Sequence, residues 1–156
     1  MPTRLLFLGG GFGGVETARR LERLLRGRGD IEITLVSRDN FFLFTPMLHE
    51  VAASDVDITH IVSPLRALLR RARIIVGEVR FVDLAQRRVV VSHGLDPHEH
   101  QLEYDHLVIA LGSTTNFYAL PGLADHALTM KTLGDAIHLR NPVIALLEQA
   151  ATEWDS

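Results

Sequence analysis

The sequence contains no cysteine among its 156 residues. A chain without cysteine forms no disulfide, offers no thiolate to a metal ion and has no cysteine redox pair. Any redox chemistry of this chain must therefore belong to a bound cofactor.

Lysine is nearly absent as well, because Lys131 is the single lysine among 16 basic residues. The net charge of −3 gives no indication of a nucleic-acid partner. Eight of the arginines form two groups. Both groups are typical of solvated helix faces, with a basic docking patch as the alternative for the second group. The first group is Arg19, Arg20, Arg23 and Arg26, and the second is Arg66, Arg70, Arg71 and Arg73.

Long apolar runs are also missing, since no stretch approaches the roughly 20 residues that cross a bilayer. The apolar stretch from Leu5 to Leu8 follows Arg4 but is shorter than the core of a signal peptide, and it gives way to glycine. With 47% hydrophobic residues the chain can bury one core. We therefore expect a cytoplasmic protein.

What the chain does contain is a glycine cluster directly after this first apolar run. Gly9, Gly11 and Gly14 form a G-x-G-x-x-G pattern that includes Phe12 and Gly13. In such a pattern the first glycine allows a sharp turn, the second lets a pyrophosphate approach the backbone, and the third lets the next helix pack closely. The pyrophosphate would lie on the N–H groups of that helix's first turn.

The surrounding pattern predicts a βαβ unit over residues 3–37. Residues 3–8 read as a buried strand, 13–26 as an amphipathic helix and 31–36 as a second strand. The helix should carry two outward ion pairs, Glu16 with Arg20 and Glu22 with Arg26. This context favours dinucleotide binding by an α/β fold whose first strand is central; the alternative is a glycine turn without a ligand.

The second strand ends in Ser37, Arg38 and Asp39, where a dinucleotide-binding protein usually has an acidic residue for the adenosine ribose. One interpretation is a ribose held by the serine hydroxyl and the backbone. Another is a pocket for a 2′-phosphate made by Ser37 and Arg38, which would indicate an NADP-dependent reductase. Asp39 offers a third possibility, a displaced carboxylate.

Residues 40–53 are aromatic and apolar without a steady period. They either pack as core or form the wall of a flat aromatic ligand such as a flavin. His49 and Glu50 follow this segment and are the two residues we would test as acid or base; no catalytic residue is assigned.

The remaining chain predicts short elements. We expect a helix from Ser63, as its cap, to about Arg71, and a last helix from Thr132 with a capping box to Asp135 that kinks or restarts at Asn141-Pro142. The expected strands are 72–76, 79–84, 87–92 and 107–113, with a polar loop over 93–100 and an antiparallel excursion over about 78–106. This excursion sets the domain apart from one built of βαβ units alone.

Four histidines lie in and near the polar loop: His93, His98, His100 and His106. Their spacing fits no standard metal site, so a solvated loop is favoured over a metal centre.

Four stretches together resemble the flavoproteins with two dinucleotide-binding domains, and within them the type II NADH dehydrogenases (non-proton-pumping NADH:quinone oxidoreductases). They are 9–14, 34–48, 104–113 and 130–136. The resemblance implies a Rossmann-like three-layer FAD/NAD(P)-binding domain with an antiparallel β insertion, incomplete, with an FAD-binding segment over 1–120 and a connecting segment and helix over 121–156.

It also implies where FAD would bind. The pyrophosphate would lie over the glycines of 9–14, and the adenosine ribose near Ser37 and Arg38. Val79 matches a position whose backbone meets the adenine, and Thr45-Pro46 matches a segment near the flavin. Ala110-Leu111-Gly112 stands where the family usually has Ala-Thr-Gly, so this chain has no threonine hydroxyl for a contact at that position.

Members of that family continue with a glycine motif for NADH, a Gly-Asp strand that closes the flavin site, and a segment that docks on the membrane. We expect this chain to be the FAD-binding portion of such an enzyme, inactive alone, with the NADH-binding domain on a longer chain or a partner chain. The whole enzyme would use NADH and quinone as a peripheral protein on the inner face of the membrane, and a homodimer is compatible with the sequence. The alternative is a non-catalytic nucleotide-binding module or truncated fragment.

Overall fold

The computed structural model describes residues 1–93 and 98–153. The chain forms two compact units. The first comprises residues 1–42 and 63–112, and the second residues 43–62 and 113–156. Each unit is described by itself.

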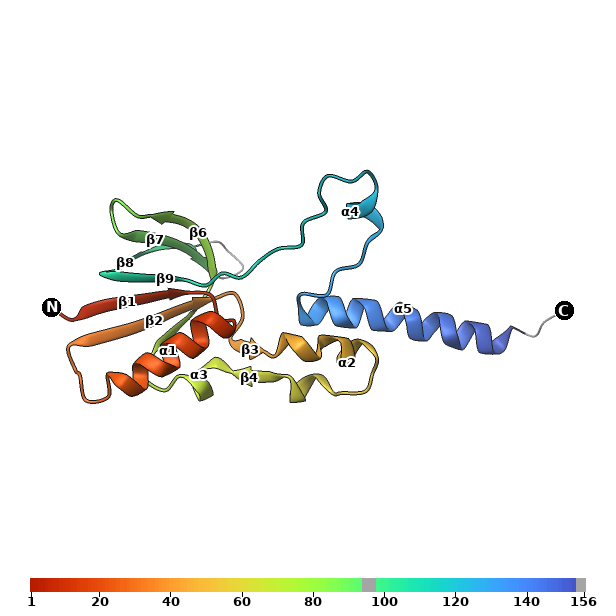
Figure 1. The fold of residues 1–156 in the computed structure, drawn as a ribbon, viewed down its shortest axis with the longest axis horizontal. Coiled ribbons are helices and arrows are strands. Elements are labelled where there is room, and N and C mark those ends of the chain that lie inside the picture. Colours follow the sequence, from red (N-terminus) through yellow and green to blue (C-terminus); the bar gives the residue numbers. More distant parts are fainter. Residues whose placement is uncertain (94–97, 154–156) are drawn as a thin grey trace. The chain divides into compact units, whose positions relative to one another are not determined.

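The first unit begins with the predicted βαβ arrangement. Strand β1 (Thr3–Leu8) leads through the glycine cluster into helix α1 (Phe12–Leu24), and β2 (Ile31–Ser37) returns parallel to β1. The parallel sheet has the order β5-β2-β1-β9, where β5 is Arg73–Val76 and β9 is His106–Ile109. The prediction that the first strand is central to the sheet is confirmed, and β9 pairs with β1 on the side opposite β2 (Figure 1).

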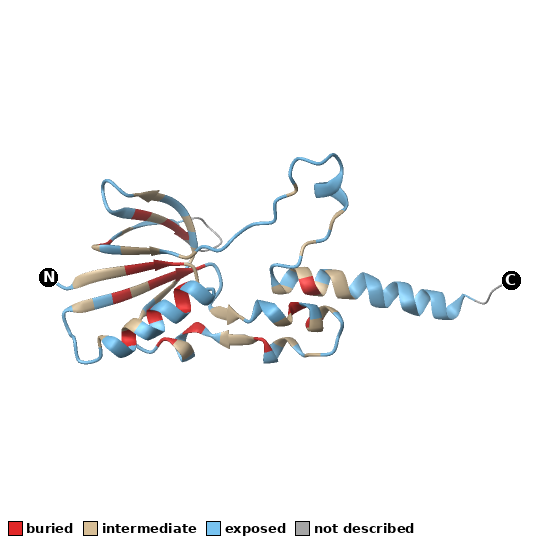
Figure 2. Ribbon diagram, in the orientation of Figure 1, coloured by how far each residue is buried: buried red, intermediate tan, exposed pale blue. Residues whose placement is uncertain are grey.

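Successive side chains of β1 and β2 point to opposite faces of the sheet, and each face is covered. Phe7 and Leu35 pack with α1 and with Leu65, whereas Leu8 and Val36 pack against the antiparallel strands. Burial of each of these side chains stabilises the fold by about 1.5 to 3 kcal/mol. The layers are therefore helix, parallel sheet and antiparallel sheet, and the predicted three-layer Rossmann-like class is confirmed (Figure 2).

The antiparallel insertion is also confirmed. It consists of β6 (Glu78–Asp83), β7 (Arg88–His93) and β8 (His98–Glu103) in the order β6-β7-β8. The predicted polar loop 93–100 is wrong at both ends, because β7 includes residue 93 and β8 begins at His98; residues 94–97 lie outside the described residues. β8 is mostly exposed, so backbone pairing with β7 holds a strand that has little apolar patterning.

The predicted N-cap at Ser63 is wrong. Ser63 lies in the short strand β4 (Val62–Pro64), which pairs with β3 (Phe41–Leu43), and helix α3 (Leu65–Leu68) begins after it. The Leu65 N–H donates to the carbonyl of Asn40 at 3.0 Å. Ser63 thus pairs in a strand, although the local sequence pattern predicted that it caps a helix.

The second unit contains short helices and one long one. Its elements are η1 (Thr45–Met47), α2 (Leu48–Ala52), η2 (Ile58–His60), α4 (Leu123–His126) and α5 (Leu133–Thr152). Leu48, Val51, Ile61 and Ala136 form its buried cluster. The predicted restart of the last helix is not found, because α5 runs through Pro142 as one helix.

The capping box at the start of α5 is confirmed. The Asp135 N–H donates to Thr132 Oγ1 at 3.1 Å, and Asp135 Oδ2 accepts the N–H groups of Lys131 and Thr132 at 2.8 and 2.9 Å. The Lys131 N–H is the main cause that lowers the pKa of the Asp135 carboxyl below its ordinary value, and the Thr132 N–H adds to it. A lowered pKa means that this carboxylate stabilises the helix fully above its ordinary pKa, and that the contribution is lost as the pH falls through the lowered value.

We therefore expect Asp135→Ala to reduce the free energy of unfolding by about 1 kcal/mol at neutral pH. The difference from the unsubstituted protein should shrink as the pH falls below the ordinary pKa of an aspartate, because the pKa of Asp135 is lowered and its carboxylate loses its charge only there. Urea unfolding followed by circular dichroism at neutral pH and at such a low pH measures it. An equal difference at both would contradict the role of the carboxylate.

The second half of α5 exposes apolar side chains (Figure 2). Leu146 and Leu147 are 64% and 66% exposed, and Val143 and Ile144 are exposed too. Within the described residues, no helix is both long and apolar enough to span a membrane.

Candidate functional site

The glycine cluster forms the turn between β1 and α1. Gly9 has a φ of +111°, a left-handed conformation that favours glycine, and its N–H donates to the carbonyl of Val36 at 2.8 Å. A Cβ on Gly9 would overlap the carbonyl oxygen of Ala110. The turn is therefore closed by the strands on both sides of β1.

The other glycines of the turn differ in their surroundings. A Cβ on Gly14 would overlap the carbonyl oxygen of Gly9, and a Cβ on Gly10 would overlap the hydroxyl of Ser37. A Cβ on Gly11 would meet no atom within 4 Å. Packing thus requires small residues at Gly9, Gly10 and Gly14, whereas packing does not explain the glycine at position 11.

The N-terminus of α1 is open to an anion. Gly11 is its N-cap, so no side chain caps the first turn, and that turn holds no acidic residue. The helix dipole stabilises a negative group there by about 0.3 to 1 kcal/mol. Phe12, 46% exposed, lies beside this end with its ring 4.8 Å from the ring of Phe42 at 77°.

Ser37 is the last residue of β2, and its side chain lies next to Gly10 of the glycine turn. It is 8% exposed, and its carbonyl accepts the N–H of Gly77 at 2.8 Å. Arg38 and Asp39 follow and are exposed.

The structure brings one further predicted residue to the glycine turn. Ala110 follows β9 directly; its N–H donates to Leu8 O at 2.8 Å, and its Cβ would lie 3.6 Å from a Cβ on Gly13. Gly112 comes two residues later with a φ of +78°. Val79 lies in β6 opposite Val91, beside a bulge in the ladder.

The remaining predicted residues belong to the second unit. Thr45 and Pro46 begin η1, and His49 and Glu50 lie in α2 with 3.9 Å between His49 Nε2 and Glu50 Oε1. The roles predicted for all these site residues stay predictions.

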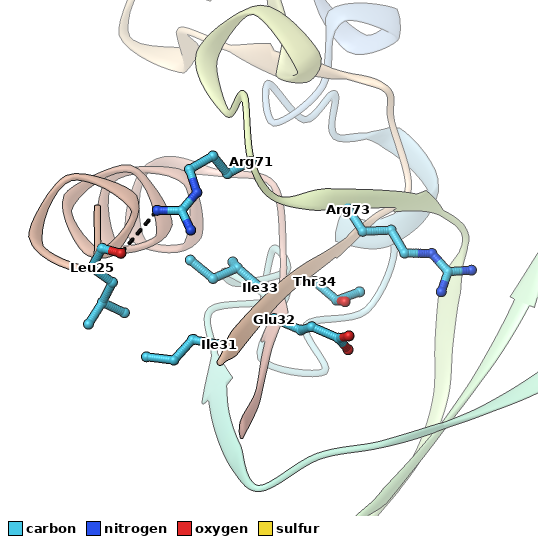
Figure 3. A pocket seen from close by; sticks show the side chains of 7 residues that line it. All are labelled: Leu25, Ile31, Glu32, Ile33, Thr34, Arg71 and Arg73. Atoms are coloured by element: carbon cyan, nitrogen blue, oxygen red, sulfur yellow. Dashed lines mark hydrogen bonds between the residues drawn. The ribbon is translucent and has the colours of Figure 1, made fainter. Parts of the chain in front are cut away.

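A pocket of about 340 Å³ lies elsewhere in the first unit (Figure 3). It is lined by Leu25, Ile31, Glu32, Ile33, Thr34, Arg71 and Arg73. These residues lie near the end of α1 and at the start of β2 and β5. The pocket is therefore at the amino ends of the parallel strands, whereas the glycine turn is at the carboxyl end of β1. Nucleotides bind at the carboxyl ends of such strands, so this pocket is not the predicted site.

Two sets of hydrogen bonds near the amino ends of these strands correct predictions from the sequence. Glu22 is 9% exposed and does not pair outward with Arg26; its carboxylate accepts backbone N–H groups from residues 70–72. Arg71 donates to the carbonyls of Leu25 and Arg28, both at 3.0 Å, so it is not part of a free solvated face. A third prediction is corrected nearer the start of α1, where Glu16 pairs with Arg19 and Arg23 instead of Arg20.

Among residues 1–93 and 98–153, no three acidic or histidine side chains lie close enough together to hold a metal ion.

Known proteins that are similar in sequence or structure support the nucleotide-binding fold described above. Residues 3–146 match the family described as pyridine nucleotide-disulphide oxidoreductase. The chain is 34% identical over 155 residues to the type II NADH:quinone oxidoreductase Ndh of Mycobacterium tuberculosis, covering 97% of this chain and 32% of that protein. It is 39% identical over 153 residues to the demethylphylloquinone reductase NdbB of Synechocystis, covering 96% and 37%.

Among solved structures, NDH2 of Plasmodium falciparum in complex with NADH superposes with a TM-score of 0.87 at 23% identity, covering 100% of this chain and 32% of that one. At that identity the likeness shows the fold alone. The chain thus spans about a third of the length of the relatives it matches.

Proposed function

Since this chain belongs to the pyridine nucleotide-disulphide oxidoreductase family, we propose that it is the FAD-binding portion of an NADH:quinone oxidoreductase. The names of its relatives support the reaction, and the open glycine turn supports the nucleotide site. The proposal covers a portion because the matched relatives are about three times as long.

The residues of the turn fit a dinucleotide. At Gly9 and Gly14 the start of α1 lies against the end of β1. The first N–H groups of α1, which no side chain caps, therefore lie beside Gly11. A pyrophosphate placed there would contact backbone N–H groups without meeting a side chain at position 11. Ser37 and Arg38 would face the adenosine ribose, while the Val79 backbone, Ala110 and Gly112 line the same site.

FAD, when bound, supplies hydride transfer from a nicotinamide and electron transfer to a quinone. This chain contributes binding and orientation. Thr45 and Pro46 are proposed to lie near the flavin, and no acid or base is assigned among the described residues.

The NADH-binding part is proposed to lie on a longer form of this chain or on a partner chain. The exposed Leu146 and Leu147 of α5 support this, because an apolar helix surface of this kind is normally covered. A peripheral position on the membrane and a homodimer of the whole enzyme belong to the same proposal.

Gly11 carries the proposal and provides its test. We expect Gly11→Ala to lower the free energy of unfolding by no more than about 1 kcal/mol, because alanine is a poorer N-cap than glycine but its Cβ enters open space and the backbone there is extended. The methyl group would lie where the pyrophosphate approaches, so FAD affinity should fall about tenfold or more. Titration of the purified chain with FAD by tryptophan and flavin fluorescence measures the affinity.

Gly29→Ala is the matched control, since Gly29 also borders open space but lies at the opposite end of α1. It should change neither stability nor affinity. Equal FAD affinity in the Gly11→Ala variant and the unsubstituted chain would contradict the proposed site. Oxidation of NADH by the purified chain with a quinone analogue would show that it is more than a binding portion.

A further inference from the structure

The pocket of Figure 3 lies where one side of β2 has no neighbouring strand. β2 pairs with β1 from Ile31 onward, whereas its pairing with β5 begins only at Thr34, which lies opposite Arg73. Residues 31–33 of β2 therefore have no register partner in β5. The same three residues line the pocket, whose volume of about 340 Å³ falls within the range of ligand pockets.

The contacts of α1 explain this gap in the sheet. The N–H groups of residues 70–72 donate to the carboxylate of Glu22, and the Arg71 side chain donates to the carbonyl of Leu25 directly after α1. The chain thus runs against α1 first and joins the sheet only at Arg73. A strand edge without a neighbour offers backbone groups to which an extended peptide can add.

The two faces of β2 give the pocket two different walls, because successive side chains of a strand point to opposite faces. Ile31 and Ile33 face α1 and form an apolar wall with Leu25, whereas Glu32 and Arg73 lie on the other side of β2 (Figure 3). Glu32 and Arg73 are exposed, and neither makes an ion pair or a side-chain hydrogen bond with a residue that the structure describes. An acid and a base of the same pocket are therefore both available to a ligand.

The spacing of the two charged residues restricts the length of that ligand. Arg73 lies opposite Thr34, and Glu32 precedes Thr34 by two residues, so the two positions differ by about 6.6 Å along the strand. One extended residue spans about 3.5 Å, and two span about 7 Å. A free amino acid is thus too short to reach both positions, whereas the ammonium and the carboxylate of an extended dipeptide can reach Glu32 and Arg73 together.

We propose that this pocket binds a free dipeptide with apolar side chains, which adds as a short parallel strand beside residues 31–33 of β2. Its ammonium would bind Glu32, its carboxylate would bind Arg73, and one side chain would pack on the wall of Leu25, Ile31 and Ile33. The pocket lies at the amino ends of the strands, so this inference does not depend on the FAD site proposed at their carboxyl ends.

Isothermal titration of the purified chain with leucyl-leucine tests the proposal. Three further probes each lack one feature: N-acetyl-leucyl-leucine has no ammonium, leucyl-leucine amide has no carboxylate, and leucine has one residue instead of two. We expect leucyl-leucine to bind saturably and about tenfold tighter than each of the other three. Absence of saturable binding, or equal affinity for the four probes, would overturn the proposal.

Two substitutions assign the ends of the ligand to the residues. Glu32→Gln should remove the preference for leucyl-leucine over its N-acetyl form, and Arg73→Gln should remove the preference over its amide. Because both side chains are exposed, neither change should alter the thermal midpoint. Retention of both preferences in these variants would show that the two residues do not bind the ends, and the proposal would fail.

Glu78 and Arg80 provide the matched control. They are an exposed acid and an exposed base two residues apart on β6, and neither lines the pocket. Glu78→Gln and Arg80→Gln should leave all four affinities unchanged. If they removed the same preferences, net charge and not the pocket would decide binding, and the proposal would be overturned.

Titration in the presence of FAD separates this inference from the proposed function. Saturating FAD should leave the affinity for leucyl-leucine unchanged, because the glycine turn is at the other end of β1. Displacement of the dipeptide by FAD would place the dipeptide at the glycine turn and would overturn this inference. A chain that binds the dipeptide but no FAD would contradict the proposed function alone.

Discussion

Gly14→Ala is expected to lower the free energy of unfolding by about 2 to 3 kcal/mol. The added Cβ would overlap the carbonyl oxygen of Gly9 and lie 3.1 Å from its carbonyl carbon. Both atoms are backbone, so no side-chain rotation relieves the overlap. Gly9 is held in place, because its N–H donates to the carbonyl of Val36 and the space for a Cβ on Gly9 is taken by the carbonyl of Ala110.

Gly13→Ala is the matched control, one residue away in the same helical turn. Its Cβ would find Ala110 at 3.6 Å, an ordinary van der Waals contact. Alanine is about 1 kcal/mol more favourable than glycine within a helix. The control should therefore be as stable as the unsubstituted chain or more stable.

Urea unfolding followed by circular dichroism measures both variants, with FAD affinity as a second measurement. Similar stability of the two alanine variants would show that the close approach of α1 to β1 is not needed for the fold. Together with Gly11→Ala, the series separates glycines needed for packing from the one proposed to admit a ligand.

The parallel core was predictable because its signals are local. The run Leu5 to Leu8 followed by glycines predicted β1 and its turn, and the β-branched residues after Ile31 predicted β2. The capping box of Thr132 and Asp135 is likewise encoded within four residues. These features need no knowledge of distant partners.

Three of the errors involve partners that lie outside the segment itself. β8 forms because β7 offers it a pairing edge, Ser63 enters a strand because β3 pairs with it, and Glu22 turns inward to meet residues 70–72. Helical periodicity placed Glu22 on the polar side, and nothing local distinguishes it from Glu16. Such contacts become visible only when the fold is assembled.

Some features of the candidate site could likewise be predicted from the sequence, and others could not. The glycine pattern and the absence of an acidic residue at position 37 were evident from the sequence, whereas the contact of Gly10 with the Ser37 hydroxyl was not. The approach of Ala110 to the turn follows from the parallel pairing of β9 with β1. It was therefore predictable once that pairing was assumed.

Glu22→Ala is the second substitution with a large expected effect. Glu22 Oε1 accepts the N–H groups of Arg71 and Ala72 at 2.9 and 2.7 Å, and Oε2 accepts that of Arg70 at 3.3 Å. Alanine would leave these donors without their acceptor in a half-buried position. A hydrogen bond to a charged group contributes about 1.5 to 3 kcal/mol.

We expect the loss of stability to exceed that of the Glu22 hydrogen bonds alone, because the segment 70–72 is also hydrogen-bonded to the end of α1 and the loop after it. Arg71 donates to the carbonyl of Leu25 directly after that helix (Figure 3), and to the carbonyl of Arg28 in the loop that follows. Glu22 and Arg71 thus link the helix and the start of β5 in both directions. We expect Glu22→Ala to lower the free energy of unfolding by about 3 kcal/mol, and Glu22→Gln to lose less because its amide oxygen still accepts.

Glu16→Ala provides the matched control on the same helix. Its ion pairs with Arg19 and Arg23 are exposed, and exposed pairs of this kind contribute at most about 1 kcal/mol. Urea unfolding at neutral pH should therefore rank the variants Glu16→Ala, Glu22→Gln and Glu22→Ala in order of increasing loss. If Glu22→Ala were no less stable than Glu16→Ala, the carboxylate would not hold the 70–72 turn, since the two substitutions remove the same atoms and differ only in burial and partners.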